Sequence, residues 1–422
     1  MDKHVYREYL AIMKEELVPA LGCTEPIAIA YGAARAREIL GELPEQITVR
    51  CSGNIIKNVK AVIVPTTGNM KGIETSAVLG AVGGDAAKKL EVLVDVTDED
   101  LAATRRLLKE KICRVELIEG VSNLQIIVEM KKGEETSLVE IAFAHTNIVR
   151  EEKNGQVLFR KEMDASGASG TDRSLLNLRD IYEFVRTVEI GEVRDLIDRQ
   201  VAYNMNIARE GLNKNYGANV GATILKYYGD DVKSRARALP AAGSDARMNG
   251  CVLPVMINSG SGNQGMTVSL PVAVYAEELK VSEDTAYRAL VLSNLVAIYQ
   301  KNELGKLSAY CGAVSAATGA GAGIAYLHGA DYEVIMETMT NTLANVSGIV
   351  CDGAKASCAA KIASSVDAAI LAYHMAADHH CFHCGEGLVK EDAEATIRSF
   401  GRMGREGMRS TDVEILKIML EP

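Results

Sequence analysis

The chain has 422 residues, 48% of them apolar, and a formal net charge of −10 at pH 7. This apolar content is too high for a disordered chain. The acidic and basic residues are mixed along the sequence, without the basic face of a nucleic-acid-binding protein. Two or three domains are expected for this length.

The first 44 residues predict two helices. Residues 4–18 have an amphipathic pattern, and residues 26–40 form a second helix whose start is marked by Thr24–Pro26. We expect residues 1–44 to pack on a helical catalytic domain. Met1–Leu17 is charged and lacks the apolar run of a secretory signal, so a cytoplasmic protein is expected.

Residues 45–165 differ from the flanking sequence because short segments alternate apolar and polar residues, which is typical of strands. Helical patterns intervene at 72–90 and 97–111, and Lys132-Gly133 and Asn154-Gly155 are hairpin turn signals. We predict a small α+β domain here, with an antiparallel sheet packed on helices as an α/β sandwich. The predicted strands are 46–51, 61–64, 91–96, 114–118, 123–130, 137–144 and 156–161.

Residues 166–422 predict a mostly helical catalytic domain that follows a small, polar linker at Ser166–Thr171. The predicted fold class is therefore α+β. Leu307–Ala330 has no charged residue and is long enough to cross a membrane. Its small side chains favour a buried segment instead, and no membrane partner is expected. Gly-rich loops are predicted near 241–250, 258–265, 319–323 and 385–387.

Cysteines stand in unusual settings at Cys23, Cys311, Cys351 and Cys358. The last two are seven residues apart, so one continuous helix would place both sulfurs on one face. Asp352-Gly353 favours a turn, with Cys358 on the helix that follows. Either geometry brings both thiolates to one metal centre, and thiolates suit iron–sulfur clusters. Three ligands leave one iron of a four-iron cluster open as a Lewis acid. Alternatively, these are buried free cysteines of Ala-rich helices.

A rival metal site is predicted at His379–Cys384, which contains three histidines and two cysteines, with His374 one turn earlier. Spacings of this kind can bind zinc, although a closed zinc site usually has a second ligand pair further along the chain. A non-catalytic metal-binding or redox-sensing protein is the corresponding functional alternative.

Five motifs occur in one order: Gly22–Pro26, Ser52–Asn58, Ser259–Gly265, Tyr310–Ala313 and Cys351–Cys358. Together they resemble the L-cysteine desulfidase family, which is related to the iron–sulfur L-serine dehydratases. The resemblance implies an oxygen-labile [4Fe-4S] cluster on three cysteines, which match Cys311, Cys351 and Cys358. It also implies conversion of L-cysteine to pyruvate, ammonia and sulfide without pyridoxal phosphate. The segment around Asp245–Gly250 is similar to serine dehydratase but not identical, which leaves L-serine or a related amino acid open as substrate.

The cysteine of the first motif, Cys23 here, is implied by the resemblance to act in catalysis or as a further cluster ligand. A helix N-terminus or a nearby cation lowers a thiol pKa, which makes Cys23 a candidate base. Lys355 is a second candidate base, or else a solvated helix lysine. Because a small amino-acid substrate carries a carboxylate, Gly-rich loops with consecutive N–H groups are candidate binding sites, although such loops are also ordinary turns. A homodimer is the default oligomer. The candidate substrate-binding residues are Ser52, Asn54, Lys57, Arg247, Ser259, Ser261, Asn263 and Gln264.

Overall fold

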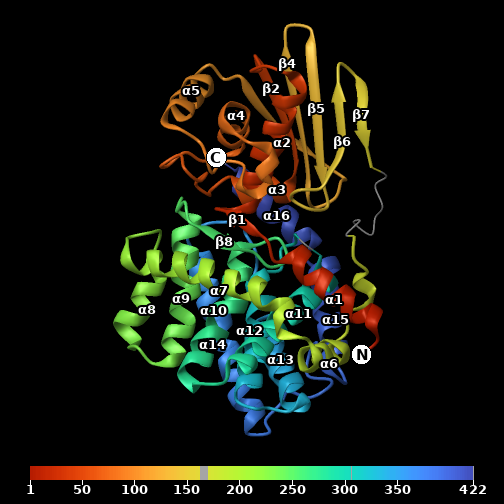
Figure 1. The fold of residues 1–422 in the computed structure, drawn as a ribbon, viewed down its shortest axis with the longest axis vertical. Coiled ribbons are helices and arrows are strands. Elements are labelled where there is room, and N and C mark those ends of the chain that lie inside the picture. Colours follow the sequence, from red (N-terminus) through yellow and green to blue (C-terminus); the bar gives the residue numbers. More distant parts are fainter. Residues whose placement is uncertain (162–169, 306, 422) are drawn as a thin grey trace.

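The computed structural model describes residues 1–161, 170–305 and 307–421. A part built around a sheet lies at one end of the long axis and a larger helical part at the other (Figure 1). The predicted α+β class is confirmed. The predicted linker at 166–171 lies mostly outside the described residues, and the domain limits stay predictions.

The sheet has six described strands in the order β3-β2-β4-β5-β6-β7. The neighbours are antiparallel except β2 and β3, which are parallel because helices cross over between them. Both hairpin turns are confirmed, with positive φ at Gly133, Asn154 and Gly155. The strands are β2 (Gln46–Ser52), β3 (Cys113–Ile118), β4 (Gln125–Lys132), β5 (Glu135–Ala142), β6 (Ile148–Lys153) and β7 (Gln156–Arg160).

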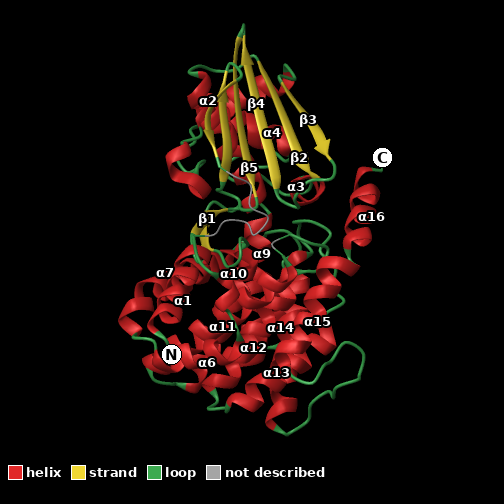
Figure 2. Cartoon of the chain, turned by 90° about the vertical axis from the view of Figure 1, so that its right-hand side faces the viewer, coloured by secondary structure: helices red, strands yellow, loops and turns green. Residues whose placement is uncertain are grey.

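Three helices lie with the sheet: α2 (Thr24–Leu40), α4 (Ile73–Gly83) and α5 (Asp98–Lys109). Figure 2 shows α2 and α4 against the strands. A Cβ on Gly80 of α4 would lie 2.3 Å from the carbonyl oxygen of Ala30 in α2, so glycine permits this close crossing. The first helix, α1 (Lys3–Glu16), packs on the helical part instead. The packing of α2 therefore differs from the prediction that residues 1–44 pack together on the helical domain.

The helical part surrounds α12, which contacts α10, α11, α13 and α14. The residues of α12 are mostly Ala and Gly. A Cβ on Gly319 of this helix would lie 2.3 Å from the carbonyl oxygen of Ser293. The helices are α6 (Leu178–Thr187), α7 (Ile190–Asn213), α8 (Val220–Tyr228), α9 (Val232–Met248), α10 (Gly262–Leu279), α11 (Glu283–Leu304), α12 (Gly312–Leu327), α13 (Tyr332–Val346), α14 (Cys358–Ala377), α15 (Ala393–Arg402) and α16 (Arg409–Leu420). Among the described residues, no helix is both long and apolar enough to span a membrane.

Short elements join the two parts. Strand β1 (Pro19–Leu21) pairs antiparallel with β8 (Pro254–Met256), and the short helix α3 (Gly53–Val59) follows directly from β2. The C-terminal helix α16 lies beside α3, far along the chain but close in space (Figure 2). The remaining helical turns are η1 (Ala86–Glu91), η2 (Arg173–Leu175) and η3 (Met403–Gly407).

Several local predictions were wrong. The predicted strands at 61–64 and 91–96 are turns and helical turns, and β6 was missed. The Gly-rich segments at 241–250 and 319–323 belong mostly to α9 and α12. Their glycines mark close helix contacts: a Cβ on Gly243 would meet the sulfur of Met266 at 2.4 Å.

Candidate active site

Four helix N-termini meet at one cavity, called the cysteine cavity below. Cys23 is the N-cap of α2, Ser261 of α10 and Cys311 of α12, and Cys358 is the first residue of α14. All four residues line the cavity, whose empty volume is about 780 Å³ including the part open to solvent. The N-terminal end of a helix carries partial positive charge and exposed N–H groups. The cavity is therefore suited to anionic groups.

The lining residues come from both parts of the fold. They are Cys23, Glu25, Asn58, His145, Arg247, Ser259, Gly260, Ser261, Asn263, Gln264, Lys301, Leu307, Ser308, Tyr310, Cys311, Gly312, Ala313, Cys351, Gly353, Ala354, Cys358 and Ile362.

Cys311 and Cys351 are held by pairing between two backbone segments. The N–H of Cys351 donates to the carbonyl of Ala309 at 2.6 Å, and that of Cys311 donates to Ile349 at 3.1 Å. After Cys351 the chain turns at Gly353, where φ is +93°, and α14 then begins at Cys358. The predicted turn between these cysteines is confirmed.

The three cysteines are half-buried, and their thiols interact with one another. All nine cysteines of the chain are free. Burial, together with the neighbouring Cys351 and Cys358, raises the pKa of Cys311 to about 12. Burial also raises the pKa of Cys358. Metal binding displaces thiol protons, and thiolates are the usual ligands of iron–sulfur clusters. The donor set therefore fits such a cluster.

In the described part of the chain, no three His, Cys, Asp or Glu side chains converge closely enough to hold a metal ion. This applies to the three cysteines and to His379–Cys384 alike. A [4Fe-4S] cluster binds its thiolates through different iron atoms, whereas zinc requires ligands that converge on one point. Cys311, Cys351 and Cys358 share one cavity, whereas Cys384 and the histidines of the rival segment are exposed on a loop after α14.

Glu25 is a buried carboxylate surrounded by donors. Its oxygens accept hydrogen bonds from the Cys23 thiol at 3.1 Å, the Thr24 hydroxyl at 3.2 Å and the Asn58 amide at 3.0 Å. His145 Nε2 lies 3.7 Å away. Burial acts to raise the pKa of Glu25, but His145 and Cys23 outweigh it and lower this pKa to about 2. Glu25 is therefore ionised at neutral pH.

His145 is 6% exposed and lies in the irregular segment between β5 and β6. Among the described residues, its Nε2 has no hydrogen-bond partner, and the same holds for Gln264 Oε1 and Tyr310 Oη. All three residues line the cysteine cavity. Buried polar atoms normally have partners, so these atoms are available to a bound molecule.

The predicted residues of α10 and the loop before it reach the cavity. Ser259, Ser261, Asn263 and Gln264 all line it. Arg247 does so too, and donates to the carbonyl of Gly22 at 2.9 Å and to Asn263 Oδ1 at 3.1 Å. Both of these acceptors are neutral, so the guanidinium charge remains available to a carboxylate.

The other predicted binding segment points elsewhere. Ser52 donates to the carbonyl of Asn123, and Asn54 donates to Asp412. Both line a second cavity beside α16, while Lys57 forms an ion pair with Asp412. The structure thus places these three residues outside the lining of the cysteine cavity, and their assignment to substrate binding stays a prediction. The reason for this placement is that α3 begins at Gly53 and packs against α16. No local sequence pattern predicts this contact.

The two candidate bases, Lys355 and Cys23, have different surroundings in the structure. Lys355 pairs with Asp352 and donates to the carbonyls of Asp352 and Gly353, so it stabilises its own loop and is not among the cavity-lining residues. Cys23 does reach the cavity, but burial raises its thiol pKa well above the usual value, and the charge of Glu25 raises it further. The helix N-terminus and the nearby cation therefore do not lower the thiol pKa of Cys23 below its usual value. The Cys23 thiol donates a hydrogen bond to Glu25 instead.

Glu25 and His145 were not assigned a role from the sequence. Glu25 stands inside the quoted motif Gly22–Pro26, so its position beside Cys23 at a helix start was the available signal. His145 lies in no motif, and only the chain path from β5 brings it to Glu25.

Glu25→Gln tests the buried carboxylate. The folded-state pKa of Glu25 lies below its ordinary value of 4.5. Glu25 therefore stabilises the fold above about pH 4.5, and this contribution is lost as the pH falls towards 2. We expect E25Q to lower the melting temperature at pH 7 and to approach wild type as the pH is lowered to acid values. Thermal unfolding followed by circular dichroism measures this, and a difference independent of pH would contradict it.

The fold and the cavity define the class: an α+β protein with a cysteine-lined, anion-attracting site between a sheet and a helical body. The family model of the serine dehydratase alpha chain matches residues 87–417. The chain belongs to this serine dehydratase alpha chain family.

Three relatives align over nearly their whole lengths, and each is named a UPF0597 protein. The relative from Lachnoclostridium phytofermentans is 58% identical over 99% of this chain and 100% of its own. That from Desulfitobacterium hafniense is 51% identical over 98% of this chain and 97% of its own. The relative from Treponema denticola is 49% identical over 100% of this chain and 99% of its own. These names specify no substrate.

Proposed function

We propose that this protein is an iron–sulfur-dependent lyase that eliminates the β-substituent of L-cysteine, releasing pyruvate, ammonia and sulfide. Membership in the serine dehydratase alpha chain family supports an iron–sulfur amino acid dehydratase as the broader class. The observation that carries the proposal is the grouping of Cys311, Cys351 and Cys358 at one cavity lined by helix N-termini. L-serine is the second candidate substrate, favoured by the family name.

Cys311, Cys351 and Cys358 would hold the [4Fe-4S] cluster. When bound through three protein ligands, such a cluster supplies an open, Lewis-acidic iron. The remaining lining residues bind and orient the substrate. Arg247 is the fixed cation for the substrate carboxylate, and the N-terminus of α10 adds N–H groups at Gly262 and beyond. A Cβ on Gly262 would lie 2.5 Å from Arg247 Nε, so the bare backbone admits the guanidinium here.

His145 Nε2 is the atom to which we assign removal of the substrate α-proton. It is buried at the cavity, and Glu25 stabilises the protonated imidazole at 3.7 Å. Loss of the α-proton and of the β-substituent leaves an aminoacrylate, which takes up water to give pyruvate and ammonia. The Cys23 thiol donates a hydrogen bond to Glu25 and so keeps that carboxylate in place.

Turnover of L-cysteine and L-serine by anaerobically reconstituted protein tests the substrate. We expect iron and sulfide to be taken up, and pyruvate to form faster from L-cysteine than from L-serine, with sulfide in equal amount. The apoprotein is the matched control and should be inactive on both. Faster turnover of L-serine would move the assignment to a dehydratase, and a wild-type protein that takes up no iron would refute the cluster.

Two further expectations stay predictions: a cytoplasmic location and a homodimer. The competing non-catalytic metal-binding protein at His379–Cys384 is separated from the lyase by the cysteine replacements in the Discussion.

A further inference from the structure

The C-terminal helix α16 is an exposed helix, and no residue of it is fully buried. Its contacts with the sheet part run along α3. At this contact lies Lys57, which is only 1% exposed. A buried ammonium needs partners for its charge and its N–H groups, so its neighbours reveal what this contact does.

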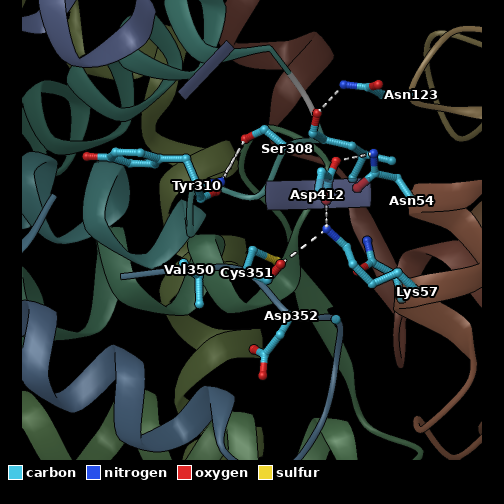
Figure 3. Close-up of polar contacts among 12 residues, drawn as sticks. Asn54, Lys57, Asn123, Ser308, Tyr310, Val350, Cys351, Asp352 and Asp412 are labelled. Carbon is cyan, nitrogen blue, oxygen red and sulfur yellow. Dashed lines mark hydrogen bonds and ion pairs between the residues drawn. The ribbon is translucent and has the colours of Figure 1, made fainter. Parts of the chain in front are cut away.

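Lys57 Nζ bridges three segments that are far apart in the sequence. It forms an ion pair with Asp412 of α16 and donates a hydrogen bond to the carbonyl oxygen of Cys351 at 3.1 Å. Asn54 Nδ2 donates to the second oxygen of Asp412 at 2.6 Å. Figure 3 shows these side chains converging from α3 and α16 beside Cys351. We call Asn54, Lys57 and Asp412 the Lys57 clamp.

The segment from Cys351 to Ser357, called the cysteine loop below, also lies directly on α3. A Cβ on Gly353 would be 2.4 Å from the carbonyl oxygen of Lys57, and the φ of Gly353 is +93°. Within this loop, Asp352 pairs with Lys355 and also with Lys361 of α14. The segment after Cys351 is therefore held by its own lysines, whereas the carbonyl of Cys351 itself is held by Lys57.

We propose that Lys57 is a positioning residue. Through the Lys57 clamp, the C-terminal helix helps to hold Cys351 in place at the cysteine cavity. The clamp fixes the Cys351 peptide, and with it the direction of the thiol, without contacting the substrate. This inference rests on the proposed function in one respect, namely that Cys351 is a cluster ligand.

The variants Lys57→Met, Asp412→Asn and the double variant separate positioning from charge balance. K57M alone leaves the Asp412 carboxylate without its cation, which is destabilising in itself. The double variant removes both charges, so we expect it to recover thermal stability relative to K57M. It does not recover the donor to Cys351, so the loop stays released.

Lys60→Met is the matched control. Lys60 is the C-cap residue directly after α3 and donates to the carbonyl of Met419 in α16. It is exposed and, among the described residues, forms no hydrogen bond or ion pair with the cysteine loop. K60M therefore removes a link between α3 and α16 while leaving the clamp intact.

The first readout needs no cluster. In the full-length apoprotein, alkylation of Cys351 is followed by peptide mass spectrometry, with the exposed Cys384 as internal reference. We expect labelling of Cys351 to rise about tenfold in K57M and in the double variant, the effect of one lost hydrogen bond on local opening, and to be unchanged in K60M. The second readout is iron bound after anaerobic reconstitution, which should fall in the same two variants only.

The two ideas fail separately. Wild-type protein that binds no iron would refute the proposed function, while the labelling rates would still decide the clamp. Wild-type labelling and full iron in the double variant would overturn the clamp. An equal effect in K60M and K57M would also overturn it, since general loosening of α16 would then be the cause.

Discussion

Replacing Cys358 by alanine is expected to abolish cluster binding and reduce turnover by more than about a hundredfold, the upper range for losing only an outer-shell partner. Alanine removes the thiolate without adding bulk, and Cys358 stands at the first position of α14 beside the other two cysteines. Cys311→Ala and Cys351→Ala should behave alike. Iron content, visible absorption and pyruvate formation are measured on anaerobically reconstituted protein.

The double variant Cys381→Ala, Cys384→Ala is the control for this loss. Both residues lie on the loop after α14, away from the described lining of the cysteine cavity. We expect it to bind iron and to turn over substrate like wild type. Loss of metal in this variant, with metal retained in C358A, would establish the His379–Cys384 site instead and exclude the cluster assignment.

The helices and strands around the site were predicted better from the sequence than the contacts that their residues make. Periodicity and helix-start signals located α2, the start of α14 and the strands of the sheet other than β6, because these depend on residues close in the chain. Ala- and Gly-rich segments were misjudged as loops. Glycine permits both a turn and a close helix crossing, and only the presence of a neighbour such as Met266 beside Gly243 distinguishes the two.

Lys57 illustrates why binding residues are harder to predict than elements. A lysine beside Gly, Ser and Asn is a reasonable anion-binding residue, but its charge is taken by Asp412, 355 residues further along the chain. His145 shows the opposite error. It stands outside every motif, yet the path of the chain after β5 brings it to Glu25 in the cavity. Contacts between residues far apart in the sequence decided both outcomes.

His145→Gln is expected to lower kcat by about a hundredfold to ten-thousandfold, the usual contribution of a general base. Glutamine keeps a polar side chain of similar reach but cannot accept the α-proton. Iron content should not change, because His145 lies beside Glu25 and is not one of the three cysteine ligands. Deuterium release from Cα-deuterated substrate should slow in parallel with pyruvate formation.

His328→Gln is the control for this replacement, because His328 stacks on Tyr373 at a ring separation of 4.8 Å and is not among the cavity-lining residues. It should leave kcat and iron content unchanged. If H145Q turned over L-cysteine like wild type, the base would have to be sought elsewhere in the cavity. If H145Q lost iron, the histidine would act on the cluster site. Full iron with slow deuterium release is the combination that only proton transfer at His145 explains, since it separates an assembled site from an active one.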